Sequence, residues 1–102
     1  MKVLLDENIP HDLAGHEVFT VAYLGWHGVE NGRLLAKAAE HGFDVVVTKD
    51  AGIEYEQNLR ALPVSVAIPQ AGSNSLEDLR PLVADLLKAL LVLEPKSLVK
   101  IG

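Results

Sequence analysis

Two short apolar runs, each followed within three residues by an acidic residue, constrain the fold of this chain most. The first is Val3-Leu4-Leu5, followed by Asp6-Glu7-Asn8, and the second is Val45-Val46-Val47, followed by Thr48-Lys49-Asp50. Short aliphatic runs bounded by polar residues are typical of strands that are buried on both faces of a parallel sheet. Because the carboxyl ends of such strands share one edge, Asp6, Glu7 and Asp50 are expected to gather there.

A cluster of carboxylates at one edge predicts a cation site. Like charges repel unless a proton or a cation lies between them, and oxygen ligands favour Mg²⁺ or Mn²⁺. Asp6 and Asp50 are the expected main ligands, with side chains within roughly 8 Å of each other, so that one hydrated ion bridges them. Glu7 is a weaker candidate because neighbouring residues on an extended chain point in opposite directions. The alternative, that these acids cap turns or are merely solvated, stays open.

The remaining apolar patterns alternate between strand and helix. Strands are expected at residues 2–5, 17–21, 44–48, 64–68 and 97–101, and helices at 11–14, 31–41, 53–59 and 76–93. Asn31 is the expected N-cap of its helix, and Gly42 the terminator. This alternation predicts an α/β fold with three layers, in which helices cover both faces of a parallel sheet of about five strands within a single domain, residues 1–102.

Composition narrows the setting and the class of partner. The chain has no cysteine, no apolar stretch near the roughly 20 residues of a membrane span, and acids at positions 6 and 7 that argue against a signal peptide. These features predict a cytoplasmic protein without membrane contact. The net charge is −5 and the nine Lys and Arg residues are scattered. If the substrate is a nucleic acid, bound metal must therefore supply part of the positive charge.

Several other residues are candidates for orienting water or contacting a substrate. Thr48 lies two residues from Asp50 on extended backbone, so their side chains share a face. The further candidates lie at the start of an expected helix, within one, or in a loop: Glu30 and Asn31, Gln57 and Asn58, and Trp26. Each has a simpler interpretation, since acids favour helix starts, polar residues on short helices are commonly solvated, and Trp26 between two glycines is suited to packing its loop onto the body.

The chain resembles the small PIN-like proteins that are related to VapC-type ribonuclease toxins. The similar segments run along nearly the whole sequence: residues 4–10, 15–18, the Gly-Trp-x-Gly loop at 25–28, 31–35, 43–45, 48–50, 57–59, 73–74 and 79–83. The resemblance implies a PIN-like α/β fold, a magnesium- or manganese-dependent nuclease site and membership of a toxin–antitoxin pair. Asp6 and Asp50 match the family's strand-end acids, whereas Asn31 and Gly52 stand where many members carry further acids.

Metal-dependent hydrolysis of RNA is the function that these observations predict, with Asp6 and Asp50 holding the metal and the other candidates supporting it. One alternative is a non-catalytic PIN-like module that folds against an antitoxin-like protein, which the acidic charge and the two missing acids favour. Another is a receiver-like phosphoacceptor domain, which also places acids after its first and third strands. The sequence leaves the RNA target and the oligomeric state, including a homodimer, open.

Overall fold

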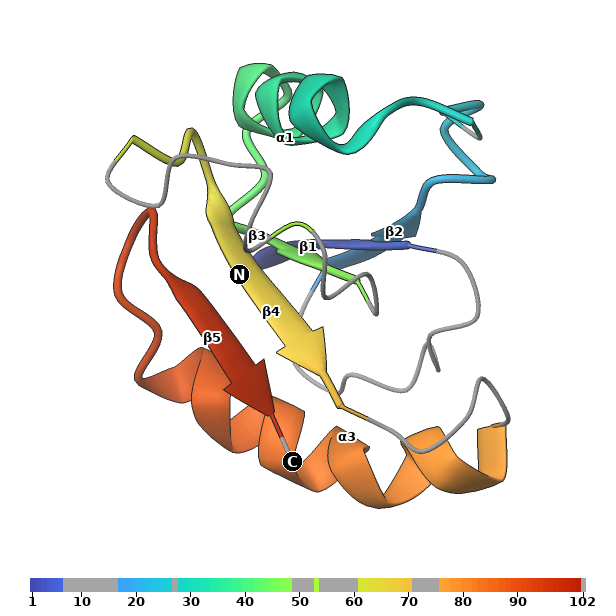
Figure 1. The fold of residues 1–102 in the computed structure, drawn as a ribbon, viewed down its shortest axis with the longest axis vertical. Coiled ribbons are helices and arrows are strands. Elements are labelled where there is room, and N and C mark those ends of the chain that lie inside the picture. Colours follow the sequence, from blue (N-terminus) through green and yellow to red (C-terminus); the bar gives the residue numbers. More distant parts are fainter. Residues whose placement is uncertain (7–16, 27, 49–52, 54–60, 71–75, 102) are drawn as a thin grey trace.

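The computed structural model contains one sheet of five parallel strands in the order β2-β1-β3-β4-β5 (Figure 1). The structure describes residues 1–6, 17–26, 28–48, 53, 61–70 and 76–101. The strands are β1 (Lys2–Leu5), β2 (Glu17–Thr20), β3 (Val45–Val47), β4 (Ser65–Pro69) and β5 (Leu98–Ile101). Each strand end lies within one residue of its expected place, so the α/β class and the parallel sheet are confirmed.

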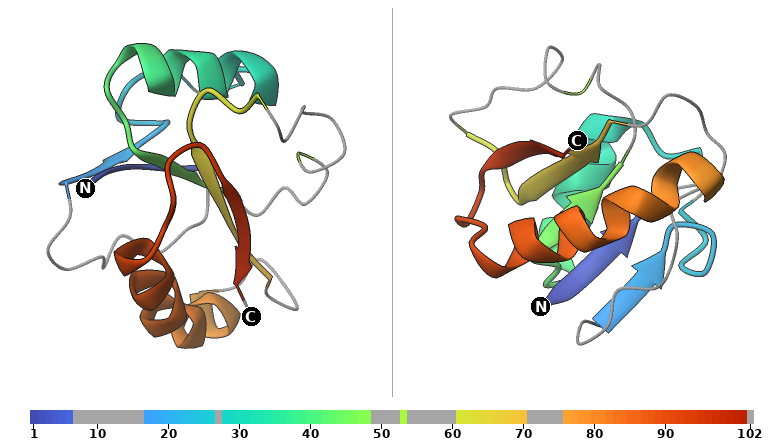
Figure 2. Two further views of the ribbon diagram at one scale, coloured as in Figure 1. Left: turned by 90° about the vertical axis from the view of Figure 1, so that its left-hand side faces the viewer. Right: turned by 90° about the horizontal axis from the view of Figure 1, so that it is seen from below.

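The apolar runs are strands that are buried on both faces. Leu4 of β1 packs into a core cluster on the face covered by helix α1 (Asn31–Glu40), together with Leu34, Leu35 and Val46. Val3 and Leu5 point to the other face, where the cluster includes Leu86 and Leu90 of helix α3 (Leu76–Leu91). Figure 2 shows the sheet between these two helices. Burial on both sides explains why these strands are continuously apolar instead of alternating.

The N-cap of helix α1 lies one residue before the position that the sequence predicted. Glu30, with φ −63° and ψ 150°, is the N-cap, and its side chain makes no capping hydrogen bond. The expectation that Asn31 is the N-cap is therefore wrong, because Asn31 is the first helical residue. The amide of Leu34 donates to the carbonyl of Glu30 at 2.8 Å, which closes the first turn.

The C-terminus of α1 follows its expectation. Gly42 has φ 78°, and its amide donates to Ala39 O, while the amide of Phe43 donates to Ala38 O at 2.9 Å. This pair of bonds is the Schellman motif, which requires a left-handed residue that glycine adopts without strain. The turn sends Phe43 back against the core and delivers the chain to β3.

Helix α3 ends at Leu91, two residues before its expected end. After Leu91 the amide of Val92 donates to the carbonyl of Ala89 at 3.2 Å, a tighter i→i−3 bond that replaces the helical pattern. Pro95 then keeps the backbone of Glu94 out of the helical region. The expected helix at residues 11–14 lies outside the described residues, and of the one at 53–59 only Ile53 is described, where it is helical and buried. Within the described part of the chain, no helix is long and apolar enough to cross a membrane.

Candidate functional site

Asp6 and Thr48 meet where the two central strands end. The Thr48 hydroxyl donates a hydrogen bond of 2.8 Å to Oδ2 of Asp6, and the Asp6 amide donates to the carbonyl of Val47 at 2.9 Å. Thr48 is only 1% exposed, whereas Asp6 is half-buried. The buried hydroxyl therefore holds a carboxylate that reaches the surface, 42 residues away in sequence.

The strand order makes this edge a natural binding position. β1 pairs with β2 on one side and with β3 on the other, so the chain reverses its direction of travel across the sheet between β1 and β3. In open parallel sheets, ligands bind outside the carboxyl ends of the strands at such a reversal. Asp6 follows β1 and Thr48 follows β3, so this pair lies at the reversal itself. The strand order, which local sequence patterns do not reveal, thus adds independent support for the candidate site.

Part of the predicted site falls outside the described residues. Glu7, Asp50, Gln57 and Asn58 belong to this group, so the expected proximity of Asp6 to Asp50 stays a prediction. Among the residues that are described, no group of three or more His, Asp or Glu side chains is placed to hold a metal ion. Asp6 and Thr48 contribute oxygen atoms at this edge, the ligand type that Mg²⁺ and Mn²⁺ prefer.

Glu30 and Asn31 lie at the start of α1, on the side of the sheet where β2 ends. The helix runs back across the sheet toward β3, so its first residues belong to the carboxyl edge (Figure 1). Glu30 is exposed, which leaves its carboxylate accessible from solvent. The structure thus brings the position of Glu30 to the predicted edge, without showing a contact between Glu30 and Asp6.

Trp26 packs instead of projecting. Its ring meets His41 edge-on at 4.9 Å between centroids and Phe43 at 6.1 Å, and the Lys37 ammonium lies 5.1 Å from its centre. Trp26 is half-buried against the core cluster beside α1. Of the two interpretations of Trp26, loop packing is therefore the one that these contacts favour over base stacking.

Tyr23 is an exposed aromatic residue at the same edge that was not among the predicted site residues. It follows β2 in a turn at the carboxyl edge, is 76% exposed, and its ring lies 6.2 Å from that of Phe19. The Tyr23 amide donates to Oγ1 of Thr20 at 3.0 Å, and the amide of Trp26 donates to the carbonyl of Val21 at 2.8 Å. The signal for Tyr23 in the sequence was its place two residues after the strand expected at 17–21, at the same edge as Asp6.

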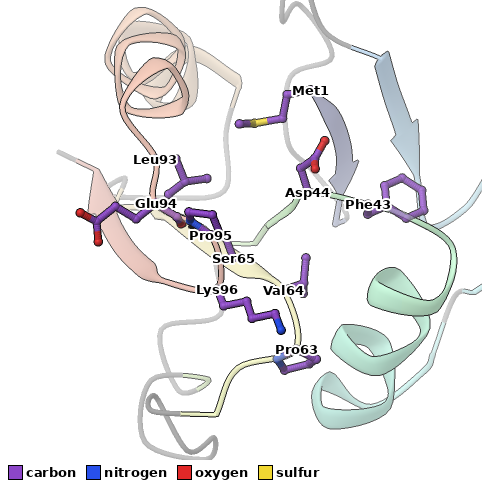
Figure 3. Close-up of a pocket in the computed structure, with 10 residues that line it drawn as sticks. All are labelled: Met1, Phe43, Asp44, Pro63, Val64, Ser65, Leu93, Glu94, Pro95 and Lys96. Carbon is purple, nitrogen blue, oxygen red and sulfur yellow. Dashed lines mark hydrogen bonds between the residues drawn. The ribbon is translucent and has the colours of Figure 1, made fainter.

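A pocket of about 230 Å³ lies at the opposite edge of the sheet (Figure 3). Its walls come from segments that precede strands and from the first residue of β4: Met1, Phe43, Asp44, Pro63, Val64, Ser65, Leu93, Glu94, Pro95 and Lys96. The hydroxyl of Ser65 is already used, because it donates to the carbonyl of Glu94 at 2.8 Å. This hollow is separate from the candidate site, since it lies at the amino ends of the strands.

Comparison with known proteins does not assign a family or a function to this site. No protein-family model, curated protein or solved structure gives a significant match to this chain.

Proposed function

We propose that this chain is a PIN-like, metal-dependent ribonuclease whose site lies at the carboxyl edge between β1 and β3. The single observation that carries the proposal is the Asp6 carboxylate, held by the buried Thr48 hydroxyl at the point where the strand order reverses. Asp50 follows Thr48 by two residues, so the sequence supplies a second carboxylate from the same segment. The residue resemblance to PIN-like proteins supports the same site.

Each residue then has a defined task. Asp6 and Asp50 hold Mg²⁺ or Mn²⁺, and Thr48 fixes the rotamer of Asp6 so that its carboxylate is oriented before the ion arrives. Glu30, Asn31, Gln57 and Asn58 offer oxygen and amide groups for positioning water or the phosphate. The bound ion supplies Lewis acidity toward the phosphodiester and its leaving oxygen. With a net charge of −5, the chain is expected to bind RNA weakly unless such a cation offsets part of the charge repulsion.

A non-catalytic PIN-like module, bound by an antitoxin-like protein, is the first alternative. Asn31 and Gly52 replace acids that the resemblance leads one to expect, which weakens the charge available for a metal. The second alternative is a receiver-like phosphoacceptor, which the order β2-β1-β3-β4-β5 favours because receiver domains share it. Against the receiver, β4 ends at Pro69, which offers no hydroxyl to a phosphoryl group.

Metal titration by calorimetry, followed by RNA cleavage, tests the proposal. The wild type is expected to bind one Mn²⁺, and the Asp6→Asn and Asp50→Asn variants are expected to lose that binding. Asp85→Asn is the matched control, because Asp85 is an exposed carboxylate on α3, away from the edge. Cleavage of structured and unstructured RNAs should follow metal binding across the four proteins.

Three results separate the alternatives. Metal binding without cleavage of any RNA favours the binding module. Covalent labelling of Asp50 by a small phosphoryl donor such as acetyl phosphate favours the receiver. Equal Mn²⁺ affinity in wild type, Asp6→Asn and Asp85→Asn contradicts a metal site at this edge altogether.

A further inference from the structure

We infer that Tyr23 is a base-stacking residue for single-stranded RNA, placed beside the site at Asp6. The inference rests on the proposed ribonuclease function, which it deepens by naming the form of the substrate and a residue that positions it. Among the aromatic residues that the structure describes, Phe19, Trp26 and Phe43 are half-buried or buried, while Tyr23 presents most of its ring to solvent. An exposed aromatic ring beside the candidate site offers a face on which a base of a single strand can stack.

The backbone at Tyr23 is held in place. The turn after β2 is closed by three backbone hydrogen bonds, from Leu24 to Thr20, from Gly25 to Ala22, and from Trp26 to Val21. The Thr20 hydroxyl also accepts a hydrogen bond from the Tyr23 amide. An aromatic side chain on a fixed turn loses little conformational entropy when a base stacks on it, which is the requirement for a stacking platform.

Tyr23 also lies near the reacting edge. Thr20 pairs with Leu5 in the parallel register of β1 and β2, and the Val21 amide donates to the carbonyl of Leu5 at 3.0 Å. Asp6 follows Leu5, so the turn that carries Tyr23 starts one strand spacing, about 4.8 Å, from the strand that carries Asp6. A base on Tyr23 would therefore place its attached backbone along the carboxyl edge.

The two lysines near these aromatic rings already interact with the rings. Stacking, more than phosphate binding, is therefore expected to supply the affinity. Lys2 lies over Phe43 at 4.5 Å and over Phe19 at 5.5 Å, and Lys37 lies over Trp26. Both ammonium groups thus make cation–π contacts with rings other than Tyr23. Even if both also met phosphates, the slope of log K against log salt would be about −1.4, from about −0.7 for each phosphate neutralised on a single strand.

Binding of fluorescein-labelled oligoadenylate, measured by anisotropy in EDTA, tests the inference without cleavage. Tyr23→Ala is expected to weaken binding roughly 5- to 150-fold, the loss of one base–aromatic stack, while Tyr23→Phe retains wild-type affinity. Leu91→Ala is the control, because Leu91 is 79% exposed at the end of α3. An abasic strand of equal length should bind the wild type as weakly as oligoadenylate binds Tyr23→Ala.

The outcomes distinguish this inference from the proposed function. Stacking-dependent binding without cleavage in Mn²⁺ upholds the role of Tyr23 and refutes the ribonuclease. Cleavage by wild type and Tyr23→Ala at equal rates and equal oligonucleotide affinities refutes the role of Tyr23 alone. No binding of oligoadenylate by the wild type, equal binding of the abasic strand, or a salt slope much steeper than about −1.4 also overturns it.

Discussion

The hydrogen bond between Thr48 and Asp6 leads to a prediction about stability. Replacing the Thr48 hydroxyl should destabilise the protein when Asp6 is present, and should not do so when Asp6 is absent. Thr48→Val keeps the shape of the side chain and removes the hydroxyl that donates to Asp6. A hydrogen bond to a charged group contributes about 1.5–3 kcal/mol. At a position only 1% exposed, the added methyl recovers about 0.8 kcal/mol of apolar burial. The net loss expected for Thr48→Val is therefore about 1–2 kcal/mol.

The same substitution should act in the opposite direction when Asp6 is absent. In an Asp6→Ala background the Thr48 hydroxyl has lost this acceptor, so replacing it with a methyl should leave stability unchanged or raise it. The coupling free energy between the two positions should then be about 1.5–3 kcal/mol, well above the error of a double-mutant cycle.

Urea denaturation followed by circular dichroism measures all four proteins of the cycle. With a slope of roughly 1–2 kcal/mol per molar, a loss of about 1 kcal/mol lowers the midpoint by about 0.5–1 M. Thr48→Ser is the control, since it keeps the hydroxyl and loses a buried methyl, and it should retain the coupling. If Thr48→Val costs the same with and without the Asp6 carboxylate, the hydrogen bond does not hold the site.

Three further substitutions probe the cluster beside α1 and the edge of the site. Gly42→Ala should lower the melting temperature, because φ 78° strains any L side chain by about 1–2 kcal/mol while nothing lies within 4 Å of the added Cβ; an unchanged melting temperature would argue against the left-handed turn. Lys2→Met should cost about 1 kcal/mol in thermal melts, since the Lys2 ammonium caps the carbonyl of His41 at 2.6 Å and lies over Phe43, and Lys2→Arg should recover part of the loss. Asn31→Asp should raise Mn²⁺ affinity in calorimetry by restoring a charge at the edge; no gain would place Asn31 outside the site.

The strands could be predicted because burial on both faces leaves an unmistakable local pattern. Val3-Leu4-Leu5 and Val45-Val46-Val47 are apolar at every position, and both strands are buried throughout their apolar runs. The role of Gly42 as helix terminator could be predicted as well, because it follows an amphipathic pattern at the position where a left-handed residue is needed. These features depend on neighbours in sequence, so the sequence alone carries them.

Features that depend on partners across the fold could not be obtained in this way. The order of strands follows from which apolar surfaces meet, and no local period encodes it. Glu30 became the N-cap of α1 because the tertiary path sets where helical backbone begins, although Asn31 has the better capping side chain. Packing of Trp26 was one of the two interpretations that its place between two glycines offered, whereas nothing in the sequence predicted that Tyr23 would remain exposed.

The polar contacts at the two ends of β1 have a consequence for how the sheet is aligned. A strand that is apolar on both faces can slip by one residue against its neighbour with little loss of hydrophobic burial, because either face accepts either set of side chains. At one end, the amide of Lys2 donates to the Asp44 carboxylate and the Asp44 amide donates to the carbonyl of Lys2. At the other end, Asp6 is bonded to Val47 and Thr48.

Each of these two polar contacts joins residues 42 positions apart in sequence, the same offset as the pairing of β1 with β3, so together they favour this one alignment. Asp6 and Thr48 are thus alignment residues as well as candidate site residues. A variant that keeps Asp6 and Thr48 for the site also keeps the register of β1 against β3. A variant that loses them would need other interactions to fix that register.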